Sequence, residues 1–461
     1  MKKAGVDCWD GPPVAVLWDQ SFVWGLLCVD TLSKIGVPFE LLSATQICGD
    51  GLEGFRILLA PGGWAIHKVR ALGETGRLKI AKFIDESGSY LGFCGGAGLA
   101  LSSPPALNLT PIRRMPMSER LPSASGRIYI SGAVSHPVWK GIDPEIPVSV
   151  WWPSQFLLEP GCEAGCLAVY SVPGADFQVA DLRVCDLDQC DRWDELEKAY
   201  GINLDPARIK GRPAIIEAER GKGRLVLSYA HLETPGDLWG NRLLLNILNY
   251  LNEASKTSGP GRASGGSRRP ISERRPKAED RRPVMSLPSS GACLPASGVS
   301  AAKKAAADLI AFGEANLLWS WRKPWLLNWR RGIRGLEYGS LYVMLSHMAD
   351  LEHKSASAQP PMSVPGWPGM AKELEEKTLE FCALAKRLLF EEKIATHAGA
   401  VSKLGKVNEK VDPLRSSLFG NKMNHGGLCS ALFDLIDRML LDLIRAAGAV
   451  NCIIRDSAGR V

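Results

Sequence analysis

The stretch Gly92-Phe93-Cys94-Gly95-Gly96-Ala97-Gly98 decides the fold that this chain is expected to adopt. An apolar run, Ser89 to Phe93, comes directly before Cys94, and a helix-compatible run, Ala97 to Leu101, follows it. Cys94 therefore falls in the turn between a buried strand and a helix. Such a turn forces its central residue into a sparsely allowed backbone conformation and needs small neighbours. The pattern is typical of a nucleophile elbow, although a small apolar cysteine in a tight turn is the alternative interpretation.

A second glycine-rich turn follows another apolar strand. Ile57 to Ala60 leads into Pro61-Gly62-Gly63, a turn that frees backbone amides. We expect the amides of Gly63 and Gly95 to form an oxyanion hole, because such donors stabilise the charge that develops on a carbonyl oxygen during acyl transfer.

A histidine and a glutamate follow a strand far downstream. Arg224 to Ala230 reads as this strand, and His231-Leu232-Glu233 comes directly after it. Because side chains alternate along an extended chain, the imidazole and the carboxylate should lie on one side. The carboxylate can orient the imidazole, which can take the proton of a thiol. Cys94, His231 and Glu233 are thus predicted to form a catalytic triad, whereas His-x-Glu alone is more often part of a solvated loop.

Together these segments resemble a known family. Their order is similar to that of class I glutamine amidotransferase domains, and more narrowly resembles the amidotransferase-like N-terminal domain of biotin-protein ligases. The resemblance covers about residues 12 to 253. It implies an α/β fold, flavodoxin-like, with a three-layer parallel sheet and with Cys94, His231 and Glu233 as the triad. The supporting stretches are Pro61-Gly62-Gly63-Trp64, Gly92 to Gly98, Trp151-Trp152-Pro153, and Gly221 to Leu225 ahead of His231-Leu232-Glu233.

Two positions depart from the family pattern. Members that hydrolyse glutamine usually carry Gln four residues after the nucleophile, where this chain has Gly98, and their usual His-Pro-Glu is here His-Leu-Glu. A related amide, ester or peptide is therefore an alternative substrate to glutamine. The C-terminal half contains no Gly-Arg-Gly-Arg-rich biotin-binding loop. We accordingly do not expect the chain to ligate biotin.

The N-terminal half alternates strand-like and helix-like segments. Val14 to Trp18 and Val37 to Leu42 read as strands, and Phe22 to Ile35 between them reads as a helix. This alternation predicts a parallel sheet with both faces covered. Ligands of such sheets gather at the carboxyl ends of the strands, where the two glycine-rich turns and His231 also fall.

Residues 104–215 are less regular and are expected to hold antiparallel strands beside the site. Trp64, Trp151 and Trp152 are candidates for an aromatic substrate pocket, although ordinary burial is the more frequent fate of such residues. The region also contains Cys162, Cys166, Cys185 and Cys190, in two pairs separated by three and four residues. Four thiols can bind zinc tetrahedrally. We favour unrelated cysteines over a zinc site, and expect no cofactor.

The composition excludes several classes of protein. The 461 residues are 46% hydrophobic and 23% charged, as in globular proteins, and no apolar run reaches the ~18 residues of a membrane span. The N-terminus does not have the pattern of a signal peptide. We therefore expect a cytoplasmic protein without a transmembrane segment, in which the 12 scattered cysteines are reduced.

Residues 254–300 differ in composition from the rest of the chain. They are rich in Ser, Gly, Pro and Arg and read as a disordered basic linker between a domain at 1–253 and another at 301–461. The linker carries nine basic and three acidic residues, an excess equal to the formal charge of +6 of the whole chain. The two domains are thus neutral together, and a nucleic-acid partner is not expected on this ground.

Residues 301–461 have apolar residues at helical spacing and predict a helical bundle of unknown function. Within it, Leu317 to Arg331 has four tryptophans among basic residues. This stretch could lie at a membrane surface or bind a partner, and a bundle core with basic edges is the favoured interpretation.

Two functional hypotheses remain open at this point. The leading one is a cysteine-dependent amidohydrolase or amidotransferase-like enzyme that acts on a small-molecule amide or ester. The alternative is a catalytically silent binding or regulatory module on the same fold, whose helical domain, residues 301–461, docks a protein partner. Gly98 favours the alternative, and the intact Cys, His and Glu argue against it.

Overall fold

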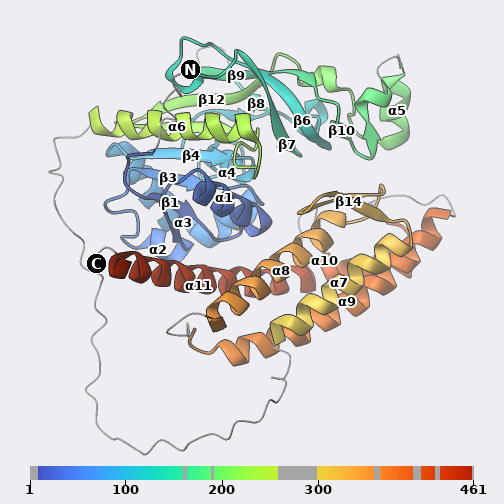
Figure 1. The fold of residues 1–461 in the computed structure, drawn as a ribbon. Coiled ribbons are helices and arrows are strands. Elements are labelled where there is room, and N and C mark those ends of the chain that lie inside the picture. The colour runs from blue at the N-terminus through green and yellow to red at the C-terminus, as the bar shows by residue number, and fades with distance from the viewer. Residues whose placement is uncertain are drawn as a thin grey trace, which may run out of the picture.

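The computed structural model of the chain describes most of both halves. The described residues are 9–158, 163–187, 192–257, 298–357, 364–397, 406–420 and 426–458. Residues 258–297, which make up most of the predicted linker, lie outside these ranges. Helix α6 (Leu238–Thr257) ends directly before them and helix α7 (Gly298–Ala315) begins directly after them (Figure 1).

The N-terminal half is built on an 11-stranded mixed sheet. Its parallel part has the order β2-β1-β3-β4-β13, the 2-1-3-4-5 order of flavodoxin-like folds. Every neighbouring pair in this part is parallel. The predicted α/β fold is therefore confirmed. The five strands are β1 (Val14–Leu17), β2 (Phe39–Leu42), β3 (Ile57–Ala60), β4 (Ser89–Phe93) and β13 (Gly223–Ser228).

Helices cover both faces of the parallel strands. Along β1, Val14 and Val16 join one apolar core, with α1 (Phe22–Lys34) and α6. Ala15 and Leu17 point to the opposite face and join a second core. That core includes α2 (Ala44–Cys48), α3 (Ala65–Asp85) and α4 (Gly95–Ala100). The alternation of β1 side chains thus produces the three layers that the sequence predicts.

Antiparallel strands extend the sheet beyond β13, as expected for residues 104–215. The order continues β12-β9-β6-β10-β11, with β7 paired to β6, and β5 and β8 form a separate two-stranded sheet. These elements are β5 (Arg113–Arg114), β6 (Ala124–Ser131), β7 (Glu145–Trp151), β8 (Phe156–Leu157), β9 (Ala164–Pro173), β10 (Gln178–Val179), β11 (Leu182–Arg183), α5 (Trp193–Tyr200) and β12 (Pro213–Arg220).

The described residues of the C-terminal half are helical apart from one hairpin. Besides α7 it contains α8 (Gly335–Ser357), α9 (Trp367–His397), α10 (Val411–Phe419) and α11 (Gly427–Ala458). Among the described residues, no helix is both long enough and apolar enough to cross a bilayer. The tryptophan-rich stretch, expected in a helical bundle core, instead forms the antiparallel strands β14 (Trp319–Lys323) and β15 (Leu326–Trp329). Tryptophan suits a pleated strand, and Trp319 and Trp321 stand two positions apart on β14.

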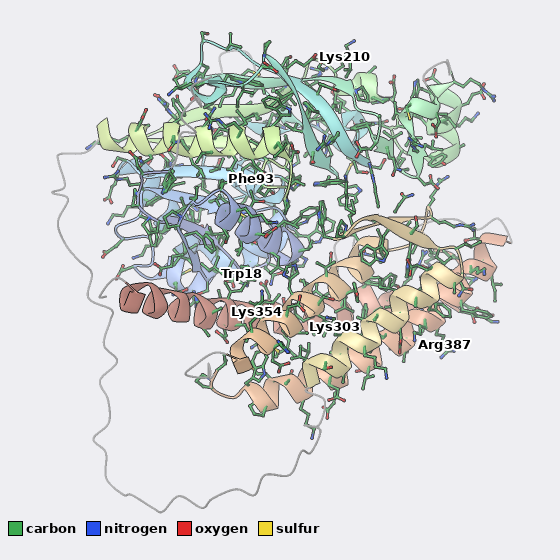
Figure 2. The ribbon with its side chains drawn as sticks, viewed as in Figure 1. Trp18, Phe93, Lys210, Lys303, Lys354 and Arg387 are labelled. Carbon is green, nitrogen blue, oxygen red and sulfur yellow. The ribbon has the colours of Figure 1, made fainter. Side chains whose placement is uncertain are left out.

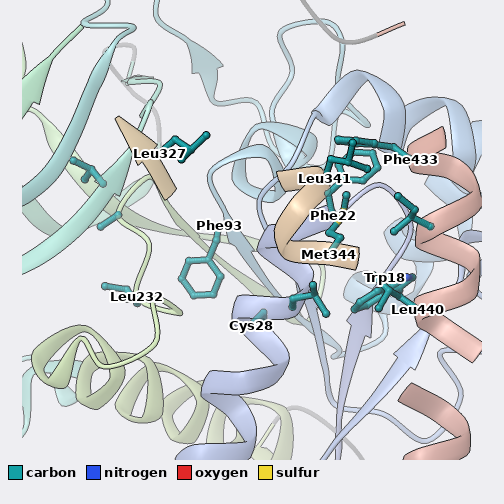
Figure 3. Packing of buried hydrophobic residues seen from close by; sticks show 14 of the residues in the cluster. Trp18, Phe22, Cys28, Phe93, Leu232, Leu327, Leu341, Met344, Phe433 and Leu440 are labelled. Carbon is teal, nitrogen blue, oxygen red and sulfur yellow. The ribbon is translucent and has the colours of Figure 1, made fainter. Parts of the chain in front are cut away.

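The two halves of the chain share one apolar core. Phe22 of α1 meets Phe433 of α11 with ring centroids 5.4 Å apart, and Leu341 and Met344 of α8 lie beside them (Figure 3). The indole of Trp18 donates a 2.8 Å hydrogen bond to the carbonyl of Asp437, on α11. The helical half is therefore packed against the α/β half.

The hairpin makes a second contact between the halves. In Figure 1, β14 lies between the β6, β7 and β10 strands and the C-terminal helices. Arg322, on β14, donates from Nη1 to Ser125 Oγ at 2.9 Å and to Gln178 Oε1 at 3.1 Å. It also donates from Nη2 to the carbonyl of Asp176. These bonds fix the hairpin to strands β6 and β10.

Candidate active site

Cys94 has the backbone conformation expected of a nucleophile elbow. It lies between β4 and α4 with φ 46° and ψ −102°, values that are rare for a residue with a side chain. Its amide donates to the carbonyl of Ser228 at 2.8 Å, and its carbonyl accepts from the amide of Gly98 at 2.8 Å. Such a conformation costs about 1–3 kcal/mol and persists where the surroundings enforce it. The thiol is partly exposed, so a substrate can reach it.

Two glycines allow the elbow to pack against the Pro61-Gly62-Gly63 turn. A Cβ on Gly95 would lie 1.9 Å from the carbonyl oxygen of Gly63, and a Cβ on Gly96 would lie 1.9 Å from that of Ala60. Any side chain at either position would collide with main chain. The structure thus brings Gly63 and Gly95, the two predicted oxyanion donors, into direct contact.

The two predicted oxyanion donors lie beside the nucleophile elbow. Gly95 is the first residue of α4, so its N–H has no acceptor within the helix. Gly63 lies in the turn that contacts Gly95. Their role as an oxyanion hole stays a prediction from the sequence.

His231 and Glu233 form a buried pair. His231 Nδ1 lies 2.7 Å from Glu233 Oε1, and each side chain is only 1% exposed. Burial by itself lowers the pKa of His231, but the negative charges of Glu233 and Cys94 outweigh it and raise this pKa to about 10. The imidazole is therefore protonated at neutral pH whenever both charges are present.

The second ring nitrogen of His231 is not used by Glu233. Nε2 is buried and makes no hydrogen bond of good geometry within the described part of the chain. Cys94 is nevertheless close enough that its charge and a loose hydrogen bond to the ring both raise the pKa of His231. Hydrogen bonds of this kind are often loose without substrate and tighten when it binds. The structure therefore brings the three predicted triad residues together.

One tryptophan side chain lies against His231, and a second packs on that tryptophan. The indole of Trp24, on α1, lies against the imidazole with ring centroids 4.8 Å apart and planes inclined by 33°. Trp152 approaches Trp24 edge-on at 6.3 Å. The carbonyl oxygen of Trp151 is 3.9 Å from Cys94 Sγ. Of the three predicted pocket residues, Trp151 and Trp152 thus lie at the site, while Trp64 packs at the start of α3 against the larger core.

The hairpin adds two further aromatic side chains that the sequence did not indicate. Trp325 meets Trp151 edge-on at 4.9 Å and Trp24 at 5.9 Å, and Trp329 stacks on Trp152 at 5.5 Å. We call Trp24, Trp151, Trp152, Trp325 and Trp329 the tryptophan cluster. Its members come from three distant parts of the chain, so only the tertiary structure reveals it.

An arginine occupies the place of the missing glutamine. The Nη2 atom of Arg114 lies 2.5 Å from where a Cβ on Gly98 would be, and 3.3 Å from the carbonyl oxygen of Gly98. A glutamine at position 98 would collide with this guanidinium. Gly98 thus leaves room for the guanidinium of Arg114, a contact that the sequence did not predict.

The possible zinc site is not tested by the structure. Cys162 and Cys190 lie outside the described residues. The thiol of Cys166 contacts the carbonyl of Ala168 at 3.4 Å, and the thiol of Cys185 contacts that of Ala175 at 3.4 Å. Among the side chains that the structure describes, no group of three or more His, Cys, Asp or Glu could hold a metal ion.

No family model and no curated protein matches the chain. Similar solved structures include a candidate GMP synthase component from Thermoplasma acidophilum, 14% identical over 54% of this chain and 96% of its own, with a TM-score of 0.34. PurLQS from Thermotoga maritima is 14% identical over 52% and 99%, with a TM-score of 0.36. A glutamine amidotransferase from Thermotoga maritima is 11% identical over 52% and 99%, with a TM-score of 0.33.

Structures resembling this chain thus include glutamine amidotransferase-like proteins, and the similarity is confined to about half of the chain. At these scores the similarity does not identify a function. The fold assignment rests on the observed strand order and helix layers, and the narrower resemblance to biotin-protein ligases stays a prediction from the sequence.

Proposed function

We propose that the chain is a cysteine-dependent amidohydrolase or amidotransferase-like enzyme. The observation that carries the proposal is the strained Cys94 next to the buried His231–Glu233 pair, whose side chains are 2.7 Å apart. A solvated His-x-Glu loop would not be buried, and an ordinary core cysteine would not need a left-handed backbone conformation.

In the proposed reaction, Cys94 Sγ attacks the carbonyl carbon of an amide or ester. A C–S bond forms, and the carbonyl π electrons move to the oxygen, which the amides of Gly63 and Gly95 would stabilise. When this intermediate collapses, the bond to the leaving group breaks and the leaving group takes a proton from His231. Water or an amine then attacks the thioester, with His231 as base, and releases Cys94.

The charge state of the site supports this sequence of steps. With Glu233 and Cys94 both charged, the pKa of about 10 keeps His231 protonated at neutral pH, and an adjacent imidazolium in turn stabilises a thiolate. The thiolate is the reactive form of cysteine, and the imidazolium is the acid that the leaving group needs. Glu233 would orient the ring and stabilise its positive charge.

The alternative function, a silent module that docks a partner through residues 301–461, is less well supported. Phe433 of α11 and Trp325 of the hairpin are both occupied by contacts with the chain's own N-terminal half. Gly98 still separates this chain from glutamine-hydrolysing members of the family that it resembles. We therefore propose an amide or ester substrate other than glutamine.

Trapping the acyl-enzyme tests the proposal. The wild-type protein is incubated with a panel of small amides and activated esters and examined by intact-mass spectrometry. An adduct on Cys94 is expected in wild type, at a much reduced rate in His231→Ala, and not in Cys94→Ala. Cys185→Ser removes an exposed thiol as a control and should leave the adduct unchanged. Failure of every acyl donor to modify Cys94, or an adduct rate insensitive to His231, would favour the silent module.

A further inference from the structure

Two arginines and a tyrosine gather around the short strand β8. Arg114 lies on β5, opposite Phe156 of β8. Arg120 donates from Nη1 to Ser154 Oγ at 3.1 Å, two residues before Phe156 in the chain. Tyr229, directly after β13, packs its ring on that of Phe156 at 4.3 Å. The β8 segment therefore brings the three side chains together.

The three side chains affect one another electrostatically, which supports their proximity. Burial lowers the pKa of Arg120, and the charge of Arg114 lowers it further. Burial raises the pKa of Tyr229, and the charge of Arg114 opposes that change while the charge of Cys94 adds to it. Tyr229 is thus within electrostatic range of both Arg114 and Cys94.

Neither arginine has a carboxylate partner in the described ranges. Other arginines with limited exposure do: Arg208 pairs with Glu197, Arg334 with Glu337, and Arg415 with Glu392, at 2.6 to 3.0 Å. The Nε atoms of both Arg114 and Arg120 are buried without a hydrogen-bond partner among the residues described. The hydroxyl of Tyr229 is close enough to Ser154 and Arg114 for hydrogen bonds that oppose the rise of its pKa. Both arginine side chains are partly shielded from water and have no carboxylate partner here, so this site has an excess of positive charge.

Arg114 contacts α4, the helix that begins directly after Cys94. Its guanidinium rests on the carbonyl oxygen of Gly98, whose amide bonds to the carbonyl of Cys94. Arg114 thus lies one helical turn from the reacting thiol. Because Gly98 has no side chain, the guanidinium can occupy the space that a Cβ would otherwise fill.

We propose that Arg114 and Arg120 form an anion subsite beside Cys94 that binds a carboxylate group on the substrate. The proposal rests on the proposed function, because it names the substrate class of the same site: an amide or ester that carries a carboxylate next to the scissile group. Guanidinium is the side chain best matched to a planar carboxylate, through two parallel N–H donors.

Two alkylating reagents of similar size test the subsite. Iodoacetate carries a carboxylate, and iodoacetamide carries a neutral amide in the same place. The rate of each reaction at Cys94 is followed by peptide mass spectrometry in wild type, Arg114→Gln and Arg120→Gln. The ratio of the iodoacetate rate to the iodoacetamide rate should fall by roughly three- to tenfold in each variant, as expected for the loss of a charge-assisted hydrogen bond.

Matched controls separate the subsite from general charge effects. Arg387→Gln removes one positive charge from an exposed position on α9, in the helical half and far from Phe93 of the elbow strand (Figure 2). This variant should keep the wild-type ratio. The same ratio at exposed Cys185 is an internal standard in every digest. If Arg114→Gln does not fold, Gly98→Ala displaces the guanidinium instead and should lower the ratio in the same way.

The outcomes distinguish the two proposals. A wild-type ratio that persists in Arg120→Gln and in either Arg114→Gln or Gly98→Ala overturns the anion subsite. The iodoacetamide rate alone reports the nucleophile: if it is fast in wild type and slow in His231→Ala, the proposed function stands whatever the ratio does. If the iodoacetamide rate is slow and independent of His231, the proposed function fails, while the ratio still decides whether the arginines attract an anion.

Discussion

Trp325 of the C-terminal half meets Trp151 of the N-terminal half edge-on, with ring centroids 4.9 Å apart and an interplanar angle of 88°. The carbonyl oxygen of the same Trp151 lies 3.9 Å from Cys94 Sγ. In space, only Trp151 therefore lies between Trp325 of the helical half and Cys94. This relationship makes the hairpin part of the environment of the site.

Replacing Trp325 should affect both stability and the reactivity of Cys94. Trp325→Ala removes its edge-on contacts with Trp151 and Trp24, each of which contributes about 0.5–1.5 kcal/mol beyond buried area. We expect a lower unfolding temperature and a changed alkylation rate at Cys94. Trp239→Ala is a matched control, since Trp239 on α6 is 39% exposed. Equal effects of the two substitutions on Cys94 would contradict a specific role of the hairpin.

Glu233→Gln should lower the pKa of His231. In wild type, burial lowers this pKa, the charges of Glu233 and Cys94 raise it, and it reaches about 10. Without the Glu233 charge, the lowering of the pKa by burial should outweigh the rise caused by Cys94. In NMR titrations, no His231 resonance should titrate near the ordinary value of ~6.5 in wild type, and one should titrate at lower pH in the variant. A wild-type midpoint near ~6.5 would contradict the buried ion pair.

The same shift predicts how stability depends on pH. The folded pKa of His231 lies above the unfolded value of ~6.5, so folding favours the protonated form. The stabilisation is complete below about pH 6.5 and is lost as the pH rises through about 10. The difference in unfolding free energy between wild type and Glu233→Gln should therefore shrink across this range in denaturant titrations. If the difference in unfolding free energy between the two proteins grew with pH, folding would not favour protonated His231, and the prediction would be wrong.

Two glycines of α4 should respond differently to alanine. A Cβ on Gly96 would lie 1.9 Å from the main-chain oxygen of Ala60, whereas a Cβ on Gly98 would meet only the end of the Arg114 side chain, at 2.5 Å. Main chain cannot move without disturbing the elbow, so Gly96→Ala should cost roughly 1–3 kcal/mol or more. Gly98→Ala should change the unfolding free energy little. Comparable losses in both variants would show that Arg114 is held rigidly.

Cutting the linker should not separate the two halves. Its paired arginines make trypsin cleavage between Arg262 and Arg282 the expected first cut, giving two resistant fragments. The shared core with Phe22 and Phe433 should keep these fragments associated in gel filtration. Phe433→Ala should weaken the association, whereas Phe390→Ala, at a side chain that is 54% exposed, should not. Separate elution of wild-type fragments would contradict the observed interface.

The parts of the site that the sequence predicted depend on local spacing. Cys94 is fixed by the glycines around it, and the His231–Glu233 pair by the alternation of an extended chain that follows a strand. These relations hold within a few residues, so they can be read without tertiary structure. The parallel sheet with helices on both faces followed from the alternation of strand-like and helix-like segments, and the flavodoxin-like fold followed from the resemblance.

The parts that the sequence did not predict depend on contacts across long separations. Trp24 reads as one apolar residue of a helix, and only packing places its ring on His231. Arg114 reaches the elbow through the short β5–β8 pair. The hairpin did have a local sign in the sequence, because Trp319 and Trp321 alternate as in a strand. The helical spacing of apolar residues in this half favoured a helical bundle core instead.

The hydrogen bond from Trp18 to the carbonyl of Asp437 joins residues separated by 419 positions. During synthesis, the complete α/β half leaves the ribosome well before α11 is made, at about 5–20 residues per second. Through that interval, Trp18 and Phe22 lack the partners that cover them in the finished protein. Nascent chains of this protein should therefore be prone to aggregation until α11 has been released from the ribosome.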